Sequence, residues 1–266
     1  MPKTTVRGIE VAYTDEGAGA PVVLLHGFPF NRSMWREQVG LLRGTHRVIA
    51  PDLRGHGDTG VAADGPATME DMAEDVAALL DQLGIQRAIL GALSMGGYVT
   101  FAFYRRHPHR VRALVLADTR SQSDADEARV NREKSARQAL DEGMGVIAEQ
   151  MIPKLFAPAT LAERPEVVGR VREMIEGTNP AGAAAALRGM AVRKDQTEFL
   201  ADILAPTLVM VGSEDTVTPP KDAELLHREI RGSRLVTIEG TGHVSNIERS
   251  AEFNQALADF LRALEP

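Results

Sequence analysis

The sequence contains no cysteine among its 266 residues, which excludes a disulfide framework, a thiolate zinc site and a cysteine nucleophile. Lys and Arg number 30 against 37 Asp and Glu, so the net charge is −7 and a basic nucleic-acid-binding stripe is not expected. No apolar run is long enough to cross a bilayer, and the stretch from Met1 to Arg7 lacks the apolar centre of a signal peptide. We therefore expect a cytoplasmic protein that binds neither nucleic acid nor membrane.

Short apolar runs alternate with amphipathic helical patterns along most of the chain. Runs such as residues 21–25 and 111–117 are largely apolar, which is typical of parallel strands buried on both faces. Thr68, with Asp71 three positions later, predicts a helix with a capping box, and Gly84 predicts its end. This alternation predicts an α/β fold with a mostly parallel sheet covered by helices on both faces.

The pattern changes between residues 120 and 193. This stretch is helical, rich in alanine and charged side chains, and without a convincing strand. We predict that residues 120–193 form an inserted helical cap, and that residues 1–119 and 194–266 together form the core domain. An amphipathic pattern predicts one closing helix from Asn246 to Leu264. Within the cap, we expect short helices separated by Pro153, Pro158, Pro165 and Pro180.

An apolar run at residues 88–93 leads into Ser94, and a helical pattern follows it. A serine on a sharp turn between strand and helix is the nucleophile elbow, in which neighbouring residues must be small. The usual motif is G-x-S-x-G. Ala92 replaces its first glycine and adds only a methyl group, whereas Gly96 supplies the second. We predict that Ser94 is a nucleophile.

Other polar residues follow the ends of other predicted strands, which meet at one edge of a parallel sheet. A serine hydroxyl needs a base to accept its proton, and His243 lies in a glycine-rich turn after the last strand. A carboxylate must then hold the imidazole. Asp215 gives the chain order serine, acid, histidine that is typical of one large hydrolase class. Asp118, at the end of the preceding strand, is the alternative acid.

Acyl transfer also needs N–H donors for the oxyanion of the tetrahedral intermediate. The backbone N–H of Met95, at the start of the helix after Ser94, is one candidate, and the backbone N–H of Phe28 is the second. His26 precedes the Phe28 loop and is expected to orient it. His56 lies in a glycine-rich loop and is expected to be structural.

These motifs together resemble the α/β-hydrolase fold family over nearly the whole chain. The resemblance implies a serine hydrolase and not a dehalogenase or epoxide hydrolase, whose nucleophile is aspartate. Within the family, residues 93–97 and 242–248 are similar to 3-oxoadipate enol-lactonases and small carboxylesterases. The segments that carry the family resemblance are His26-Gly27-Phe28-Pro29, Asp52-Leu53-Arg54-Gly55-His56-Gly57, Ser94-Met95-Gly96-Gly97, Gly212-Ser213-Glu214-Asp215 and Gly242-His243.

The cap is expected to supply an apolar substrate pocket. A substrate that carries a carboxylate would need an arginine there, and the candidates are Arg32, Arg120 and Arg137. The predicted substrate-binding residues are Trp35, Met144, Phe156 and Val217, with Phe28, Met95, Met151 and Leu155 as further lining candidates.

The sequence therefore predicts a serine hydrolase, without cofactor or metal, that cleaves a small carboxylic ester or lactone through an acyl-enzyme on Ser94. A 3-oxoadipate enol-lactonase is a specific case of this chemistry. A carbon–carbon bond hydrolase and a cofactor-free perhydrolase are alternatives on the same fold. A ligand-binding signalling receptor is an alternative from another class, because fold and triad do not determine function.

Overall fold

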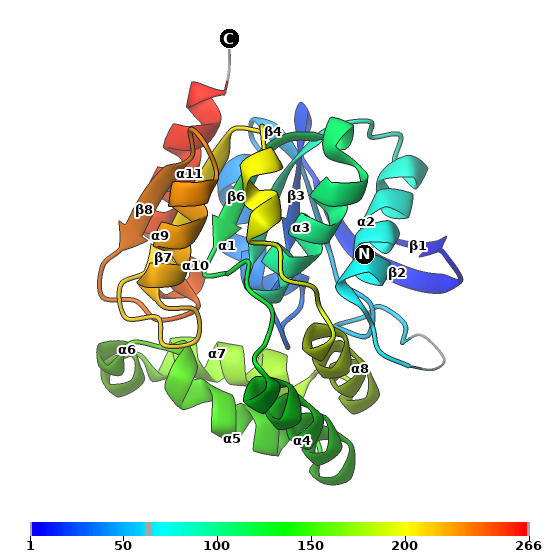
Figure 1. Ribbon diagram of the computed structural model, residues 1–266, viewed down its shortest axis with the longest axis vertical. Helices are drawn as coiled ribbons and strands as arrows, with labels where there is room; N and C mark the ends of the chain where they lie inside the picture. Colours follow the sequence, from blue (N-terminus) through cyan, green and yellow to red (C-terminus); the bar gives the residue numbers. More distant parts are fainter. Residues whose placement is uncertain (1, 62–64, 265–266) are drawn as a thin grey trace.

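The computed structural model describes residues 2–61 and 65–264, and within these ranges eight strands form one sheet (Figure 1). Its strand order is β1-β2-β4-β3-β5-β6-β7-β8. β2 runs antiparallel to both β1 and β4, whereas the other neighbouring pairs are parallel, which confirms the predicted sheet. The strands are β1 (Lys3–Val6), β2 (Ile9–Glu16), β3 (Ala20–Leu25), β4 (His46–Pro51), β5 (Ala88–Leu93), β6 (Val111–Ala117), β7 (Thr207–Gly212) and β8 (Arg234–Ile238).

Helices cover both faces of the sheet, as the alternating pattern predicts. In Figure 1, α2, α3 and α9 lie in front of the strands, and α1 and α11 lie behind them. α2 packs against α3, and α1 packs against α11. These helices are α1 (Arg36–Leu42), α2 (Met69–Gln82), α3 (Met95–Arg106), α9 (Pro220–Glu229) and α11 (Ser250–Ala263), with 3-10 helices η1 (Arg32–Trp35), η2 (Pro108–Arg110) and η3 (Glu198–Asp202).

Local sequence signals account for the elements that carry the core. All six residues of β5 are buried, as expected for an apolar run with a strand on either side and helices above and below. The predicted capping box at the start of α2 is present. The Asp71 N–H donates to Thr68 Oγ1 at 3.0 Å, and that hydroxyl donates to Asp71 Oδ2 at 2.6 Å. Gly84, with φ +67°, follows the helix as predicted.

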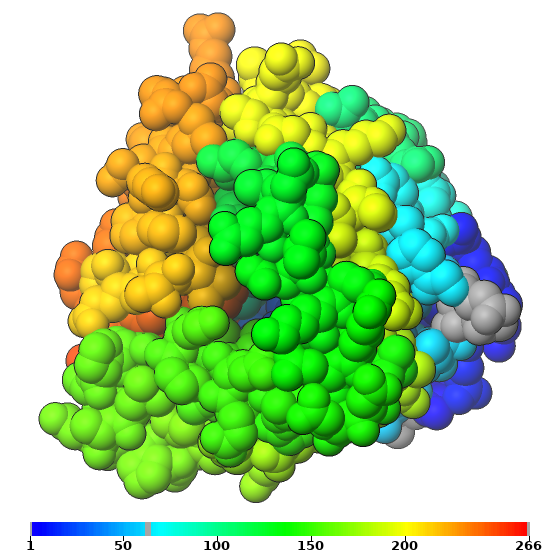
Figure 2. All heavy atoms as spheres, turned by 60° about the horizontal axis from the view of Figure 1, so that its bottom comes forward, coloured from blue at the N-terminus to red at the C-terminus, as the bar shows by residue number. Residues whose placement is uncertain are grey.

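A separate group of helices, α4 to α8, occupies the chain between β6 and β7. The group lies below the sheet in Figure 1 and forms the green surface at the bottom of Figure 2. Hydrogen bonds join it to the loops after β3 and β8: Thr178 Oγ1 donates to Pro29 O at 2.6 Å, and the His243 N–H donates to Leu155 O at 2.8 Å. It therefore covers the carboxyl ends of the strands. The helices are α4 (Asp126–Glu142), α5 (Met144–Leu155), α6 (Pro158–Glu163), α7 (Pro165–Glu176) and α8 (Pro180–Ala191).

Two expectations about helix boundaries are wrong. Pro158, Pro165 and Pro180 are the first residues of α6, α7 and α8, as predicted, but Pro153 lies inside α5. Its missing N–H leaves out one hydrogen bond of the helix, but α5 continues past it to Leu155. The closing helix is divided into α10 (Ser245–Glu248) and α11, because the residue between them, Arg249, has φ −127° and ψ 61° and is not helical.

α3 packs closely against the sheet at Gly96. A Cβ at this position would overlap the carbonyl oxygen of Leu25 in β3, which is backbone and cannot rotate away. We expect Gly96→Ala to lower the free energy of unfolding by about 1–3 kcal/mol or more. Gly169→Ala is the matched control because a Cβ there, on α7, meets nothing within 4 Å. It should raise stability by about 0.5–1 kcal/mol. Denaturant unfolding of both variants measures the difference, and equal stabilities would contradict this account.

Candidate active site

Ser94 lies on a strained turn between β5 and α3. Its backbone has φ 53° and ψ −114°, a region that residues other than glycine rarely occupy. The turn is held on both sides: the Ser94 N–H donates to Ala117 O at 3.0 Å, and Thr119 Oγ1 donates to Ser94 O at 2.8 Å. Ala92, which departs from the usual elbow motif, is fully buried in β5. The local geometry is that of a nucleophile elbow.

His243 contacts both Ser94 and Asp215. Its Nε2 lies 2.8 Å from Ser94 Oγ, and its Nδ1 lies 2.8 Å from Asp215 Oδ2. Because an ionised carboxylate can only accept hydrogen bonds, Nδ1 carries the ring proton. Nε2 then presents its lone pair to the Ser94 hydroxyl and can accept the proton of that hydroxyl. The structure thus brings the predicted nucleophile, base and acid together in the expected order.

The surroundings of Asp215 favour its ionised form. Its Oδ1 accepts the N–H groups of Val217 at 2.8 Å and Thr218 at 2.9 Å, and its Oδ2 accepts the Thr218 hydroxyl at 2.8 Å. Burial would raise the pKa of Asp215, but the charge of His243 and these hydrogen bonds outweigh it and hold that pKa below its ordinary value. The carboxylate can therefore stabilise an imidazolium beside it.

Asp118, the alternative acid, has other partners. Its Oδ1 accepts the Gly212 N–H at 2.9 Å, and its Oδ2 accepts the Ser245 hydroxyl at 2.6 Å. Burial, with the nearby charge of Asp215, raises the pKa of Asp118 to about 7. Gly212 precedes the Asp215 turn and Ser245 follows His243, so Asp118 holds these two turns beside each other. The geometry places Asp215 and not Asp118 on the imidazole.

The pKa of His243 reflects its two acidic neighbours. Burial lowers it, but the charge and hydrogen bond of Asp215 and the charge of Asp118 outweigh burial and raise it above its ordinary value. The imidazole is therefore neutral, and able to accept a proton, only above this raised pKa. Acidification through that pKa removes the acceptor.

The predicted oxyanion donors lie on the two expected turns. Met95 is the first residue of α3, where helical N–H groups have no partner within the helix. Phe28 lies in the turn after β3, next to His26 and His56. The His26 ring fixes that turn, because its Nδ1 donates to Gly27 O at 2.9 Å while its Nε2 accepts the Leu53 N–H at 2.9 Å.

His26 and His56 are both neutral. Burial lowers the pKa of His26 to about 4 and that of His56 to about 3. Their rings lie 5.1 Å apart, and the His56 ring also meets Phe28 edge-on at 6.0 Å. They pack the loops after β3 and β4 together, in line with the structural roles expected for them.

A cavity of about 300 Å³ lies between Phe28 and the cap helices α4, α5 and α8. Arg120, whose charge lowers the pKa of His243, lines it. Phe28 and Met151 also line it, as expected of apolar residues around a substrate. The full lining is Phe28, Arg120, Asp124, Ala128, Asn131, Arg132, Ser135, Ile147, Gln150, Met151 and Leu187.

The four predicted substrate-binding residues do not line this cavity. Trp35, the last residue of η1, is buried in the core and not in a pocket, with its ring 6.3 Å from that of Phe253 in α11. Met144 and Phe156 are buried at the two ends of α5. Val217 is exposed beside Asp215, to which its N–H donates. An apolar residue near the site in sequence can pack into the core as readily as into a pocket.

Two of the three candidate arginines also lie away from the cavity. Arg32 is buried in ion pairs with Asp52 and Asp58. The side chain of Arg137 is 71 % exposed on α4 and pairs with Glu133. Arg120 remains, and Arg132, which sequence reasoning missed, joins it.

Arg120, Arg132 and Arg193 share one acceptor. All three pair with Asp124, whose side chain is completely buried. Their charges outnumber that of the carboxylate, so the cavity wall formed by Arg120 and Arg132 is positively charged. The spacing of four residues between Arg120 and Asp124 was the one signal in the sequence that could have indicated this ion pair. Both residues precede α4, and the sequence alone does not show that the chain brings Arg193 to them.

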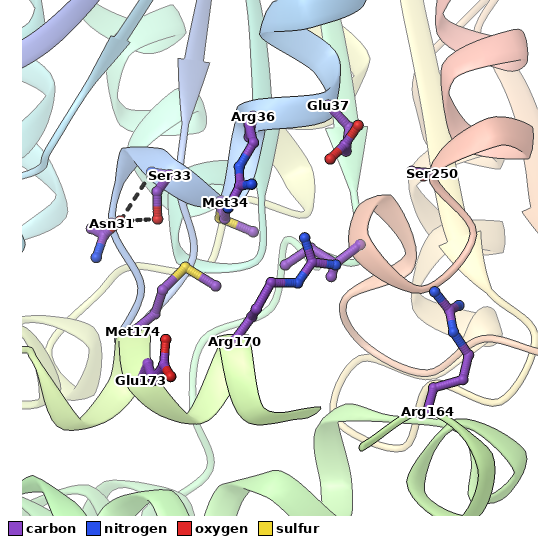
Figure 3. A pocket seen from close by; sticks show the side chains of 11 residues that line it. Asn31, Ser33, Met34, Arg36, Glu37, Arg164, Arg170, Glu173, Met174 and Ser250 are labelled. Atoms are coloured by element: carbon purple, nitrogen blue, oxygen red, sulfur yellow. Dashed lines mark hydrogen bonds between the residues drawn. The ribbon is translucent and has the colours of Figure 1, made fainter. Parts of the chain in front are cut away.

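A second cavity, of about 280 Å³, lies at the junction of α1, α7 and α10 (Figure 3). Arg36 and Arg170 reach into it from α1 and α7, and Arg164 lies at its edge. Neither the predicted catalytic residues nor the predicted oxyanion donors line it. The cavity beside Phe28 is the candidate substrate pocket because Phe28, a predicted oxyanion donor, is part of its lining.

The family of alpha/beta hydrolase fold proteins matches residues 20–250. The match spans most of the chain, which therefore belongs to this family and is a hydrolase of the α/β-hydrolase superfamily. No helix in the described ranges is both long and apolar enough for a membrane span.

Esterases and lactonases are similar along nearly the whole chain. A thermophilic esterase from Thermogutta terrifontis, solved with malate bound, is 44% identical, with a TM-score of 0.95 over 99% of this chain and 97% of its own. The enol-lactonase from Burkholderia xenovorans LB400 is 32% identical, with a TM-score of 0.91 over 98% and 100%. A pimeloyl-[acyl-carrier protein] methyl ester esterase of Neisseria meningitidis serogroup C is 33% identical over 91% of this chain and 94% of its own.

Replacing Asp215 tests how the raised pKa of His243 arises. We expect Asp215→Asn to lower that pKa, because the substitution removes the largest favourable contribution to the charged ring. NMR titration of the imidazole resonances measures the change. Glu214→Gln is the matched control, since it removes the same charge from the exposed neighbouring position. A pKa that stays unchanged in Asp215→Asn, or moves equally in both variants, would contradict this explanation.

Proposed function

We propose that the protein is a serine hydrolase that cleaves a small carboxylic ester or lactone through an acyl-enzyme on Ser94. The observation that carries the proposal is the continuous contact from Asp215 through His243 to Ser94, with 2.8 Å at each step. A serine hydroxyl becomes a useful nucleophile only beside such a base. The esterases and the enol-lactonase to which the chain is similar support the same chemistry.

The reaction begins when Ser94 Oγ attacks the substrate carbonyl and its proton passes to His243 Nε2. Asp215 stabilises the imidazolium that forms, and the N–H groups of Phe28 and Met95 are proposed to bind the oxyanion. His243 then returns the proton to the leaving alcohol as the carbon–oxygen bond breaks. In the second half, His243 takes a proton from water, the hydroxide attacks the acyl-enzyme, and the acid is released as Ser94 regains its proton.

The positive wall of the cavity favours substrates with a carboxylate in addition to the reacting carbonyl. Arg120 and Arg132 belong to a cluster in which three arginines share one buried acid. The Nε of Arg120 is buried and has no hydrogen-bond partner within the described ranges. An acidic lactone of the enol-lactonase type fits this charge distribution, which makes enol-lactone hydrolysis the specific form of the proposal that we favour.

Replacing the nucleophile is the direct test. We expect Ser94→Ala to lower the rate of ester hydrolysis by about 10³-fold or more and to abolish labelling by a fluorophosphonate. Turnover of p-nitrophenyl acetate and butyrate measures the rate. Ser233→Ala is a close control, because Ser233 Oγ also contacts a histidine nitrogen, His227 Nδ1 at 2.9 Å, but on the protein surface.

Ser233→Ala should hydrolyse the esters and react with the fluorophosphonate as the wild type does. Hydrolysis that survives in Ser94→Ala would refute the acyl-enzyme. Labelling of Ser94 without turnover of these esters would instead favour a more specialised substrate, carbon–carbon cleavage or a ligand-binding role.

Substrate charge can be tested separately. We expect Arg132→Gln to lower kcat/KM for monoethyl succinate by about ten- to a hundredfold, because a charge-assisted hydrogen bond contributes about 1.5–3 kcal/mol. Ethyl pentanoate, of similar length but neutral, should be affected much less. Arg137→Gln is the matched control on the same helix, with its side chain 71 % exposed and paired with Glu133. An equal loss for both esters would show that Arg132 has no part in recognising the carboxylate.

A further inference from the structure

Glu248, the last residue of α10, is a buried carboxylate that the reaction above does not use. It is 2 % exposed. Its Oε1 accepts the Gly242 N–H at 2.6 Å, and both of its oxygens accept the Ala157 N–H, at 3.2 and 3.1 Å. Within the described ranges its carboxylate forms no ion pair with Lys or Arg. Burial raises the pKa of Glu248, and the hydrogen bonds from Gly242, Ala157 and the Thr160 side chain oppose that rise.

The two segments that contain Gly242 and Ala157 belong to different parts of the fold. Gly242 directly precedes His243, the proposed base, whereas Ala157 lies between α5 and α6 of the cap. The same segments also meet directly, since the His243 N–H donates to Leu155 O at 2.8 Å. The backbone of His243 is thus held on one side by the cap and on the other by the carboxylate of Glu248 through Gly242.

Steric contacts show how closely the segments fit. A Cβ at Gly242 would lie 2.7 Å from Leu155 O, 2.8 Å from the carbonyl carbon of Phe156 and 2.9 Å from Ala157 N. These are backbone atoms, so the cap segment itself would have to move away to admit a side chain. Residues 155–157 therefore pack directly against the turn that carries His243.

A further contact ties the cap to the end of α10. Arg164, at the junction of α6 and α7, donates from Nη1 to the backbone oxygen of Glu248 at 2.5 Å. Figure 3 shows this side chain reaching from the cap toward the helix that carries Ser250. Both the side chain and the backbone of Glu248 thus contact the cap.

We propose that Glu248 is a positioning residue that joins the cap segment 155–157 to the His243 turn, so that His243 reaches Ser94 only while the cap is seated. The proposal rests on the proposed roles of Ser94 and His243. His243 Nε2 and Ser94 Oγ lie 2.8 Å apart, and because hydrogen bonds form only up to about 3.2 Å, a shift of the turn by about 1 Å would break the contact. Movement of the cap away from the core would therefore withdraw the base as well.

Two substitutions at Glu248 separate positioning from fold stability. Glu248→Ala removes every acceptor, and we expect kcat to fall about 100-fold with a much smaller change in KM, as for a reacting group displaced by about 1 Å. Glu248→Gln keeps one acceptor oxygen for the Gly242 N–H but turns an NH₂ group toward Ala157. It should recover about tenfold of the lost kcat, because a side-chain amide can accept as well as donate.

Asp75→Asn is the matched control. Asp75, on α2, is also a buried carboxylate, 5 % exposed, but it pairs with Arg7 and Arg54 and does not contact the His243 turn. It should lower thermal stability with little change in kcat. All variants are assayed well below their melting temperatures on the p-nitrophenyl ester that the wild type hydrolyses, beside Ser94→Ala.

Hydrogen exchange supplies a readout that does not depend on activity. In the folded Glu248→Ala protein, peptides covering residues 155–160 and 240–245 should both exchange faster than in the wild type and in Asp75→Asn. If Glu248→Ala does not fold, Glu248→Gln carries the test with a smaller increase in the same two peptides.

Three results would overturn the proposal. In the first, the folded Glu248 variants keep the wild-type kcat and have only a lower melting temperature. In the second, Glu248→Gln and Asp75→Asn lose kcat equally. In the third, only one of the two peptides exchanges faster. Activity that persists in Ser94→Ala would instead refute the proposed function, whereas an inactive Ser94→Ala beside fully active Glu248 variants would refute only the positioning role.

Discussion

The position of Ser94 depends on how closely α3 approaches the sheet. A Cβ at Gly96 would overlap a backbone oxygen of β3, and one at Gly97 would overlap the Thr119 side chain after β6. This close approach forces the chain through the left-handed backbone conformation of Ser94 and turns its hydroxyl toward His243. The strain is sustained by the buried strands on either side, so the core and the candidate site cannot be altered independently.

Buried charges are balanced around the site in different ways. Asp215 is balanced by His243 and by N–H groups of its own turn, whereas Asp124 is surrounded by arginines. Glu248 depends on backbone N–H groups, and Asp118 on the Ser245 hydroxyl and the Gly212 N–H. Each carboxylate joins segments that are distant in the sequence, so these polar groups determine how the loops lie on an otherwise apolar core.

The sequence predicted most of the fold because its strongest signals are local. The capping box at Thr68 and the apolar runs that enclose β5 identify helices and strands without knowledge of their partners. Parallel strands then bring Ser94, Asp215 and His243 to one edge whatever the loops do. What could not be predicted depends on contacts between distant segments.

The pocket shows this limit. Whether Trp35 faces a cavity or the core depends on the placement of Phe253, which is far along the chain. The positive wall likewise depends on the loop that brings Arg193 to Asp124. Glu248 belongs to a segment that the motif comparison singled out, but its contact with Ala157 spans 91 residues and leaves no local signal.

The position of Trp35 has an optical consequence. It is the only tryptophan in the chain, 1 % exposed, and its ring lies beside Phe253 of α11. The buried ring is thus shielded from bulk water and packs against an aromatic side chain. Indole fluorescence from the native protein therefore comes from one interior point where η1 meets α11. Its emission shifts to longer wavelength when that contact is lost and the ring meets water, which makes the intrinsic fluorescence a reporter of the core.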